Sequence, residues 1–115
     1  MQIIRFFPRQ AVAGGSATLY SEIYEVPDAA QVITELRLYS YSGTGAVSAT
    51  IQDSMSPTFA PDTAWRDVAS NGLSAVTGLV LSGSGLQRFV RAKLTVASTI
   101  TGAIVAVEGV TKDPT

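Results

Sequence analysis

Apolar and polar residues alternate along much of the chain, most clearly between residues 32 and 41. One side of this segment holds Val32, Thr34, Leu36, Leu38 and Ser40, and the other holds Ile33, Glu35, Arg37, Tyr39 and Tyr41. Successive side chains of a β-strand point to opposite faces, so a period of two predicts a strand. Because the charged residues share the second side, we expect the first side to face the core.

The same alternation recurs in short segments that turn-forming residues separate. We predict strands at residues 2–7, 17–26, 32–41, 46–53, 65–68, 73–81, 87–96 and 100–108. In two of them we expect Val47, Ala49, Ile51, Val90, Ala92, Leu94 and Val96 to face inward, and Ser48, Thr50, Gln52, Phe89, Arg91, Lys93 and Thr95 to face outward. The glycine-containing turn at residues 42–45 predicts an antiparallel hairpin between strands 32–41 and 46–53.

Many short strands with turns between them are typical of a sandwich or barrel. We therefore predict an all-β fold, namely an antiparallel β-sandwich that is jelly-roll-like with about eight strands. An immunoglobulin-like sandwich is the second choice. The 115 residues suit one domain. We divide it into an extended N-terminal arm at residues 1–10, the β-sandwich at residues 11–110 and a polar tail at residues 111–115.

The arm carries large side chains that are too apolar to be left in water. Two placements remain open: an edge strand of the chain's own sheet, or a strand laid on a neighbouring subunit. In the second case, Arg5 and Arg9 would pair with acidic residues of that subunit. The candidates for a partner or oligomer interface are therefore Ile3, Ile4, Arg5, Phe6, Phe7 and Arg9.

Composition narrows the chemistry. The chain has no Cys and no His, which excludes disulfides, thiolate and imidazole metal sites, and an imidazole base. The net charge of −1 argues against nucleic-acid binding by bulk electrostatics. No apolar run approaches the ~20 residues of a spanning helix. We therefore expect no cofactor, no metal, no nucleic acid, no membrane partner and no enzymatic activity.

Acid–base chemistry would have to come from carboxylates. Asp53, Asp62 and Asp67 cluster around one loop, where two of them could flank a glycosidic bond or several could bind calcium. The ordinary interpretation is that Asp62 caps a turn and the other two sit at strand ends. We favour the ordinary interpretation.

Three aromatic residues are candidates for surface recognition. Tyr39 and Tyr41 fall on the polar side of their strand, and Trp65 lies beside the longest irregular stretch. Exposed aromatic rings stack on sugars or anchor protein contacts. The alternatives are cross-strand pairing for the tyrosines and, for Trp65, a plug that closes one end of the sandwich.

Four segments together resemble small β-sandwich structural proteins of tailed bacteriophages. They are Ala49-Thr50-Ile51-Gln52-Asp53-Ser54, Thr63-Ala64-Trp65-Arg66-Asp67-Val68, Gln87-Arg88-Phe89-Val90-Arg91-Ala92-Lys93-Leu94-Thr95-Val96 and Gly102-Ala103-Ile104-Val105-Ala106-Val107. They follow the family's layout of a strand ending in a polar loop, a W-x-D-(V/L) strand, an R-(F/Y)-V-R strand and a G-A-x-V strand. The resemblance spans residues 46–108.

The resemblance implies a non-enzymatic virion structural protein. Decoration, head-completion and tail-associated proteins share the pattern, and a sandwich with little around it favours a capsid decoration (cement) protein. The expected partner is the major capsid protein or another virion protein, bound by a homo-oligomer, with a trimer favoured. The expected location is the virion, assembled in the bacterial cytoplasm. A head–tail connector or tail-associated role and a carbohydrate-binding module remain as alternatives.

Overall fold

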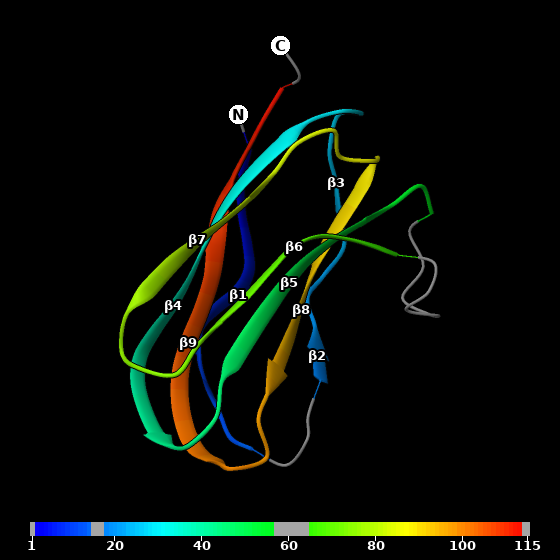
Figure 1. The fold of residues 1–115 in the computed structure, drawn as a ribbon. Coiled ribbons are helices and arrows are strands. Elements are labelled where there is room, and N and C mark those ends of the chain that lie inside the picture. Colours follow the sequence, from blue (N-terminus) through cyan, green and yellow to red (C-terminus); the bar gives the residue numbers. More distant parts are fainter. Residues whose placement is uncertain (1, 15–17, 57–64, 114–115) are drawn as a thin grey trace.

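The computed structural model describes residues 2–14, 18–56 and 65–113, and these form strands without any helix. The strands are β1 (Gln2–Val12), β2 (Thr18–Tyr20), β3 (Tyr24–Glu25), β4 (Gln31–Gly43), β5 (Val47–Ser54), β6 (Arg66–Leu73), β7 (Gly78–Gly83), β8 (Phe89–Val96) and β9 (Ile100–Lys112). They build two antiparallel sheets that face each other, as Figure 1 shows. Sheet A has the order β1-β9-β4-β7, and sheet B has the order β2-β8-β5-β6, with β3 also paired to β8.

The strand order is that of a jelly roll. β1 pairs with β9, β2 and β3 pair with β8, β4 pairs with β7, and β5 pairs with β6. These nested pairs form one long antiparallel ribbon, and the additional pairs β4–β9 and β5–β8 roll it into two sheets. The predicted all-β sandwich is confirmed, and the nested order is the jelly-roll one.

The core lies between the sheets and consists of the residues that the alternation placed inward. Leu36 and Leu38 of β4 are at most 1% exposed, and Ile51 and Leu94 of sheet B are fully buried. Burying a side chain of this size contributes roughly 1.5–3 kcal/mol, so the two inward faces supply most of the stabilisation. The period of two therefore identified the core side of β4, β5 and β8 correctly.

The predicted hairpin between strands 32–41 and 46–53 is wrong. β4 belongs to sheet A and β5 to sheet B, so the turn between them crosses from one sheet to the other. Gly43 and Gly45 have positive φ angles of 109° and 96°, which lets the chain make this crossing. The turn is held to the neighbouring crossing by a hydrogen bond from the Thr44 amide to the Thr99 carbonyl, at 3.2 Å.

The predicted strand at residues 73–81 is also wrong. Leu73 ends β6 in sheet B, and Gly78 begins β7 in sheet A. Residues 74–77 cross between the sheets, so Leu73 and Leu81 are buried from opposite layers of the sandwich. The predicted strand at residues 65–68 is the beginning of β6, which continues to Leu73.

A β-bulge corrects the predicted faces at the end of β4. Leu38 pairs with Val105 and Ser40 pairs with Ile104, so Tyr39 is an extra residue in the ladder. Beyond the bulge the faces exchange. Ser40, predicted to face the core, is exposed, whereas Tyr41, predicted to face outward, packs against the core.

The predicted arm is an edge strand of the chain's own sheet, which was one of its two open placements. Ile4, Phe6 and Phe7 are buried in the core at 0%, 3% and 6% exposure. Phe6 and Phe7 can both point inward because the ladder steps from Arg5–Glu108 to Phe7–Val107, which leaves Phe6 as a bulge residue. Ile3, Arg5 and Arg9 remain exposed.

The first and last strands, β1 and β9, lie side by side at their outer ends. Gln2 pairs with Thr111, and β9 continues to Lys112, so the first part of the predicted polar tail is sheet. Residues 1, 114 and 115 lie outside the described residues. The structure therefore joins the predicted arm and the start of the tail to the sandwich as paired strands.

Candidate functional site

The outer face of sheet B holds a buried cation between two aromatic rings. The guanidinium carbon of Arg91 lies 4.2 Å from the ring centre of Tyr20 and 4.4 Å from that of Trp65. Arg91 is 0% exposed and Trp65 is 5% exposed, although neither belongs to the core between the sheets. A desolvated cation stacked on aromatic faces is stabilised by roughly 2 kcal/mol or more.

Side-chain hydrogen bonds extend this stack across three strands. Arg91 Nε donates to Gln52 Oε1 at 2.9 Å, and Gln52 Nε2 donates to Asp67 Oδ1 at 2.8 Å. Arg91 and Gln52 were both predicted to face outward. They do lie on the outer face of sheet B, as predicted, and the rings and their hydrogen-bonding partners bury them there.

The stack explains two of the sequence motifs. Trp65 and Asp67 come from the W-x-D-V segment, and Arg91 ends the R-F-V-R segment. The two motifs therefore meet at one place and hold β6 to β5 and β8. Tyr20 could not be identified from the sequence, because the stack joins residues 20, 65 and 91 and no local pattern marks such a contact.

Asp53 makes a second structural contact at the end of sheet B. Its carboxylate, 0% exposed, accepts hydrogen bonds from Arg66 Nε at 3.0 Å, Arg66 Nη2 at 2.7 Å and the Gln87 amide at 3.0 Å. The hydrogen bond and the negative charge of Asp53 raise the pKa of Arg66 further above its usual range, so this guanidinium stays charged. A carboxylate whose oxygens are used in this way has little left for a metal or a substrate.

The predicted carboxylate cluster does not form a paired site in the described residues. Asp53 pairs with Arg66 and Gln52 pairs with Asp67 in the β5–β6 ladder, so the two aspartates project to opposite faces of sheet B. Asp62 lies outside the described residues. Among residues 2–14, 18–56 and 65–113, no group of three metal-ligating side chains comes together.

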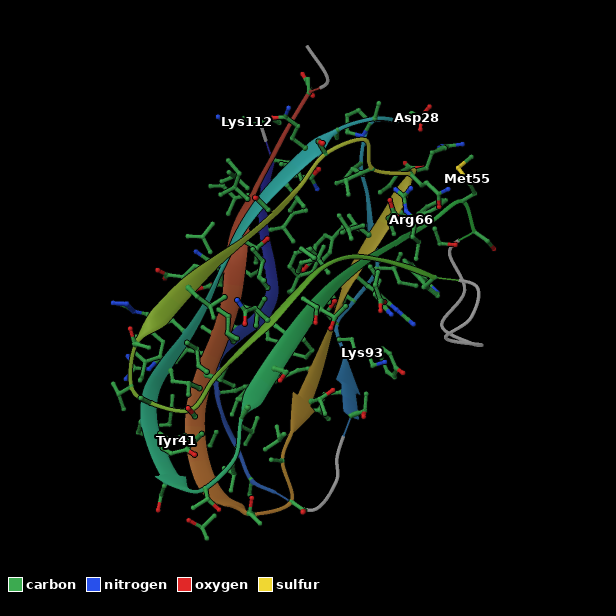
Figure 2. The ribbon with its side chains drawn as sticks, viewed as in Figure 1. Asp28, Tyr41, Met55, Arg66, Lys93 and Lys112 are labelled. Carbon is green, nitrogen blue, oxygen red and sulfur yellow. The ribbon has the colours of Figure 1, made fainter. Side chains whose placement is uncertain are left out.

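The three aromatic candidates lie on separate surfaces. Tyr39 is 39% exposed on the outer face of sheet A, with the guanidinium carbon of Arg9 4.2 Å from its ring centre. Tyr41 donates a hydrogen bond of 2.6 Å to the Gly45 carbonyl, and Figure 2 shows it near the β4–β5 turn, at the opposite end of the sandwich from Arg66. Trp65 stacks on Arg91. The structure therefore does not gather these rings into one platform.

A cavity of about 540 Å³ lies along the side of the sandwich where β1 and β2–β3 are the edge strands. Its walls include Phe7, Leu19 and Tyr20. Tyr24 bridges the sheets, because its hydroxyl donates to the Arg5 carbonyl at 3.0 Å and its ring meets Phe6 edge-on at 5.7 Å. Burial and the nearby charge of Glu22 raise the pKa of Tyr24 above its ordinary value, so the hydroxyl keeps its proton.

The outer face of sheet A exposes a row of aliphatic side chains. The β1–β9–β4 ladder places Ile3, Val110 and Ile33 at one level, and we call them the aliphatic row. Ile3 is 73% exposed, Ile33 is 39% exposed, and Val110 between them is partly exposed. Val80 of β7, which pairs with Glu35 at the next level, is 64% exposed. Side chains of this type in solvent mark a contact surface when they lie together.

Two charged rows follow the aliphatic row along the same face. In the glutamate row, Glu108 pairs with Glu35 on one side and with Arg5 on the other, where Arg5 Nε lies 3.2 Å from Glu108 Oε2. The next level is the arginine row of Arg9 and Arg37, which flank Ala106 of β9. The two rows carry opposite charge at neighbouring levels of one surface.

The face ends in a shallow hollow of about 530 Å³. Small side chains line much of it, with Ala11 and Ala13 on the β1 side and Ser40 and Ser42 on β4. Gly102 of β9 lies within it, and a Cβ built there would meet no atom within 4 Å. The outer face of sheet A thus runs from protruding aliphatic side chains, through two charged rows, to open space.

No helix among the described residues is long and apolar enough to cross a membrane. No protein-family model matches the chain, and no curated protein matches it significantly.

Proposed function

We propose that the protein is a non-enzymatic virion structural protein, a capsid decoration protein that binds the shell of the major capsid protein as a homo-oligomer. The aliphatic row on the outer face of sheet A is the observation that carries this proposal. Ile3 and Ile33 expose large apolar side chains beside charged ones, which is the composition of a protein-contact surface. The jelly-roll architecture also serves viral capsid proteins, and the resemblance to bacteriophage motifs supports a bacteriophage particle.

The chemistry of the described residues fits a structural role. Asp53, Arg66, Gln52 and Arg91 take part in contacts that hold strands together. A decoration protein stabilises a shell by covering the joints between subunits, so it needs complementary surface rather than reactive groups. Tyr39, Tyr41 and Trp65 lie apart from one another, so the carbohydrate-binding alternative has less support from the geometry.

The test is rebinding to shells. Virions purified from the source culture should contain the chain at a fixed ratio to the major capsid protein, measured by quantitative mass spectrometry. Particles stripped of the chain should take up the recombinant protein in a sedimentation assay. Ile33→Asp should weaken this uptake at least tenfold, because it places a charge in the aliphatic row.

Thr95→Asp is the matched control, since Thr95 is an exposed strand residue on the outer face of sheet B. It should rebind as the wild type does. Both variants should unfold at temperatures close to that of the wild type. Absence of the chain from purified virions, or equal uptake of Ile33→Asp and wild type, would contradict the proposal.

A further inference from the structure

β9 contributes one outward residue to each level of the outer face of sheet A. From the C-terminal end, Val110 lies in the aliphatic row and Glu108 in the glutamate row. Ala106 lies between the two arginines, and Ile104 and Gly102 lie in the hollow. These five residues alternate along one strand, so they stand at evenly spaced levels of about 6.6 Å.

The order of these levels is self-complementary. A two-fold axis that lies in the interface and crosses β9 at the level of Val107 would exchange positions 110 and 104, and positions 108 and 106. The aliphatic row of one copy would then lie over the hollow of the other. The glutamate row would lie over the arginine row. An isologous contact requires a surface that matches itself in this way.

We infer that the outer face of sheet A binds a second copy of the same chain, face to face, about this two-fold axis. The inference rests on the proposed function and names a second copy as the partner of the aliphatic row, so the row serves shell binding by forming the homo-oligomer rather than by touching the shell. Strands of the two copies run antiparallel across the interface, and their sheets pack at about 10 Å with a crossing angle near 30°.

The charges favour this arrangement. Glu35 of each copy faces Arg37 of the other, and the contact occurs twice because the axis relates the copies. Glu108 lies between Arg9 and Arg37 of the other copy. Arg5 faces Arg9, which is the one like-charged contact, and both have partners within their own chain: Arg5 pairs with Glu108 and Arg9 stacks on Tyr39. Opposite charges at matched levels fix the register of a contact more than they strengthen it.

The shapes favour it as well. Ile3 and Ile33 protrude from the surface, and the hollow receives them at the corresponding level of the other copy. Ala11 faces Ile3 there, and Ser40 and Ile104 face Ile33 and Val110. Ala11 and Ser40 are small and leave room for the branched side chains of Ile3 and Ile33, while Ile104 contacts Val110. The interface therefore has apolar contacts at both ends and charged rows between them.

Sedimentation velocity over a range of protein concentrations tests the inference. The wild type should form a dimer. Gly102→Phe should shift the dissociation constant at least tenfold toward monomer, because the new ring fills the hollow. A Cβ at Gly102 meets no atom within 4 Å, so the new side chain begins in open space, and circular dichroism checks that the variant is folded. Thr95→Phe places the same ring on sheet B and should leave the dimer unchanged.

A charge exchange tests the register independently. Glu35→Arg should weaken the dimer at least tenfold, and so should Arg37→Glu. The double variant with both substitutions should return the dissociation constant to within about threefold of the wild type, because each copy again offers opposite charges at matched levels. Circular dichroism confirms that each variant is folded.

Three results would overturn the inference: a wild type that is monomeric at all concentrations, a trimer, or a dimer that Gly102→Phe leaves intact. The outcome is distinguishable from that of the shell-binding test. A monomeric wild type that still binds shells overturns the two-fold contact and the homo-oligomeric form of the proposed function, and leaves shell binding itself in place. A dimer with the expected responses that never binds shells supports the contact and overturns the proposed function.

Discussion

Arg91→Met is expected to lower the free energy of unfolding by about 3–5 kcal/mol. The variant loses two cation–π contacts with aromatic rings and one hydrogen bond to a buried acceptor. The methionine fills much of the space between Tyr20 and Trp65 but carries no charge for their ring faces. It also removes the donor to Gln52 Oε1, which is buried. Chemical denaturation followed by the fluorescence of Trp65, the chain's single tryptophan, measures both the stability and the environment of the stack.

Arg88→Met is the control for the loss of an arginine. Arg88 also belongs to the R-F-V-R segment, but its side chain is 55% exposed and its ion pair with Glu25 is at the surface. An exposed pair of this kind contributes about 0–1 kcal/mol. Similar losses in both variants would contradict the assignment of Arg91 as the cation that holds the outer face of sheet B together.

Gly109→Ala is expected to destabilise the protein by about 3 kcal/mol, at the upper end of what overpacking costs. A Cβ at Gly109 would overlap the Ile33 carbonyl oxygen and come within 2.7 Å of the Thr34 Cα. Both atoms belong to the backbone of β4, so the β4–β9 ladder itself would have to move apart. A glycine inside a strand often marks such a close approach of another backbone. Thermal unfolding monitored by circular dichroism measures the effect.

Gly102→Ala on the same strand is the matched control. Its Cβ would meet no atom within 4 Å, so it should be neutral or stabilise the protein by up to about 1 kcal/mol through the lower entropy of the unfolded chain. A comparable loss of stability in both variants would show that the cost lies in replacing a strand glycine rather than in the contact with β4.

The core faces of the long strands could be predicted because burial imposes the period of two directly on the sequence. In β4, β5 and β8, every second residue from Val32 to Leu38, from Val47 to Ile51 and from Val90 to Val96 is buried. The nature of the fold followed from the number of such segments. Sequence pattern is reliable here because a shift of one residue would expose a whole row of apolar side chains.

The connections between strands could not be predicted in the same way. Residues 44–46 look like a hairpin turn, yet they carry the chain from sheet A to sheet B. A short glycine-containing turn serves both purposes, and the choice depends on which strand lies beside β4. Near the turn that strand is β9, more than fifty residues away in the sequence, so the local sequence cannot indicate the pairing. The bulge at Tyr39 could not be predicted for the same reason, because it is a shift in the pairing register between β4 and β9.

The candidate site was predicted in part. Ile3 and Arg9, chosen because the arm is apolar with arginines between its large side chains, do lie on the outer face of sheet A. Ile4, Phe6 and Phe7 form part of the core instead: Ile4 points inward by the normal alternation, and the bulge at Phe6 lets both phenylalanines point inward. Ile33, Val110 and Val80 were not singled out from the sequence, although they are also exposed or partly exposed on this face. Only the sheet order places Val110 and Ile33 at the level of Ile3, and Val80 lies at the next level on β7, the opposite edge of the sheet.

Electron cryomicroscopy of virions purified from the source culture tests the central claim most directly. We predict jelly-roll density at regular positions on the outside of the shell, present in symmetric copies, with the outer face of sheet A covered by another protein chain. Particles that lack this density, or density in which the face formed by β1, β9, β4 and β7 points into solvent, would contradict the account.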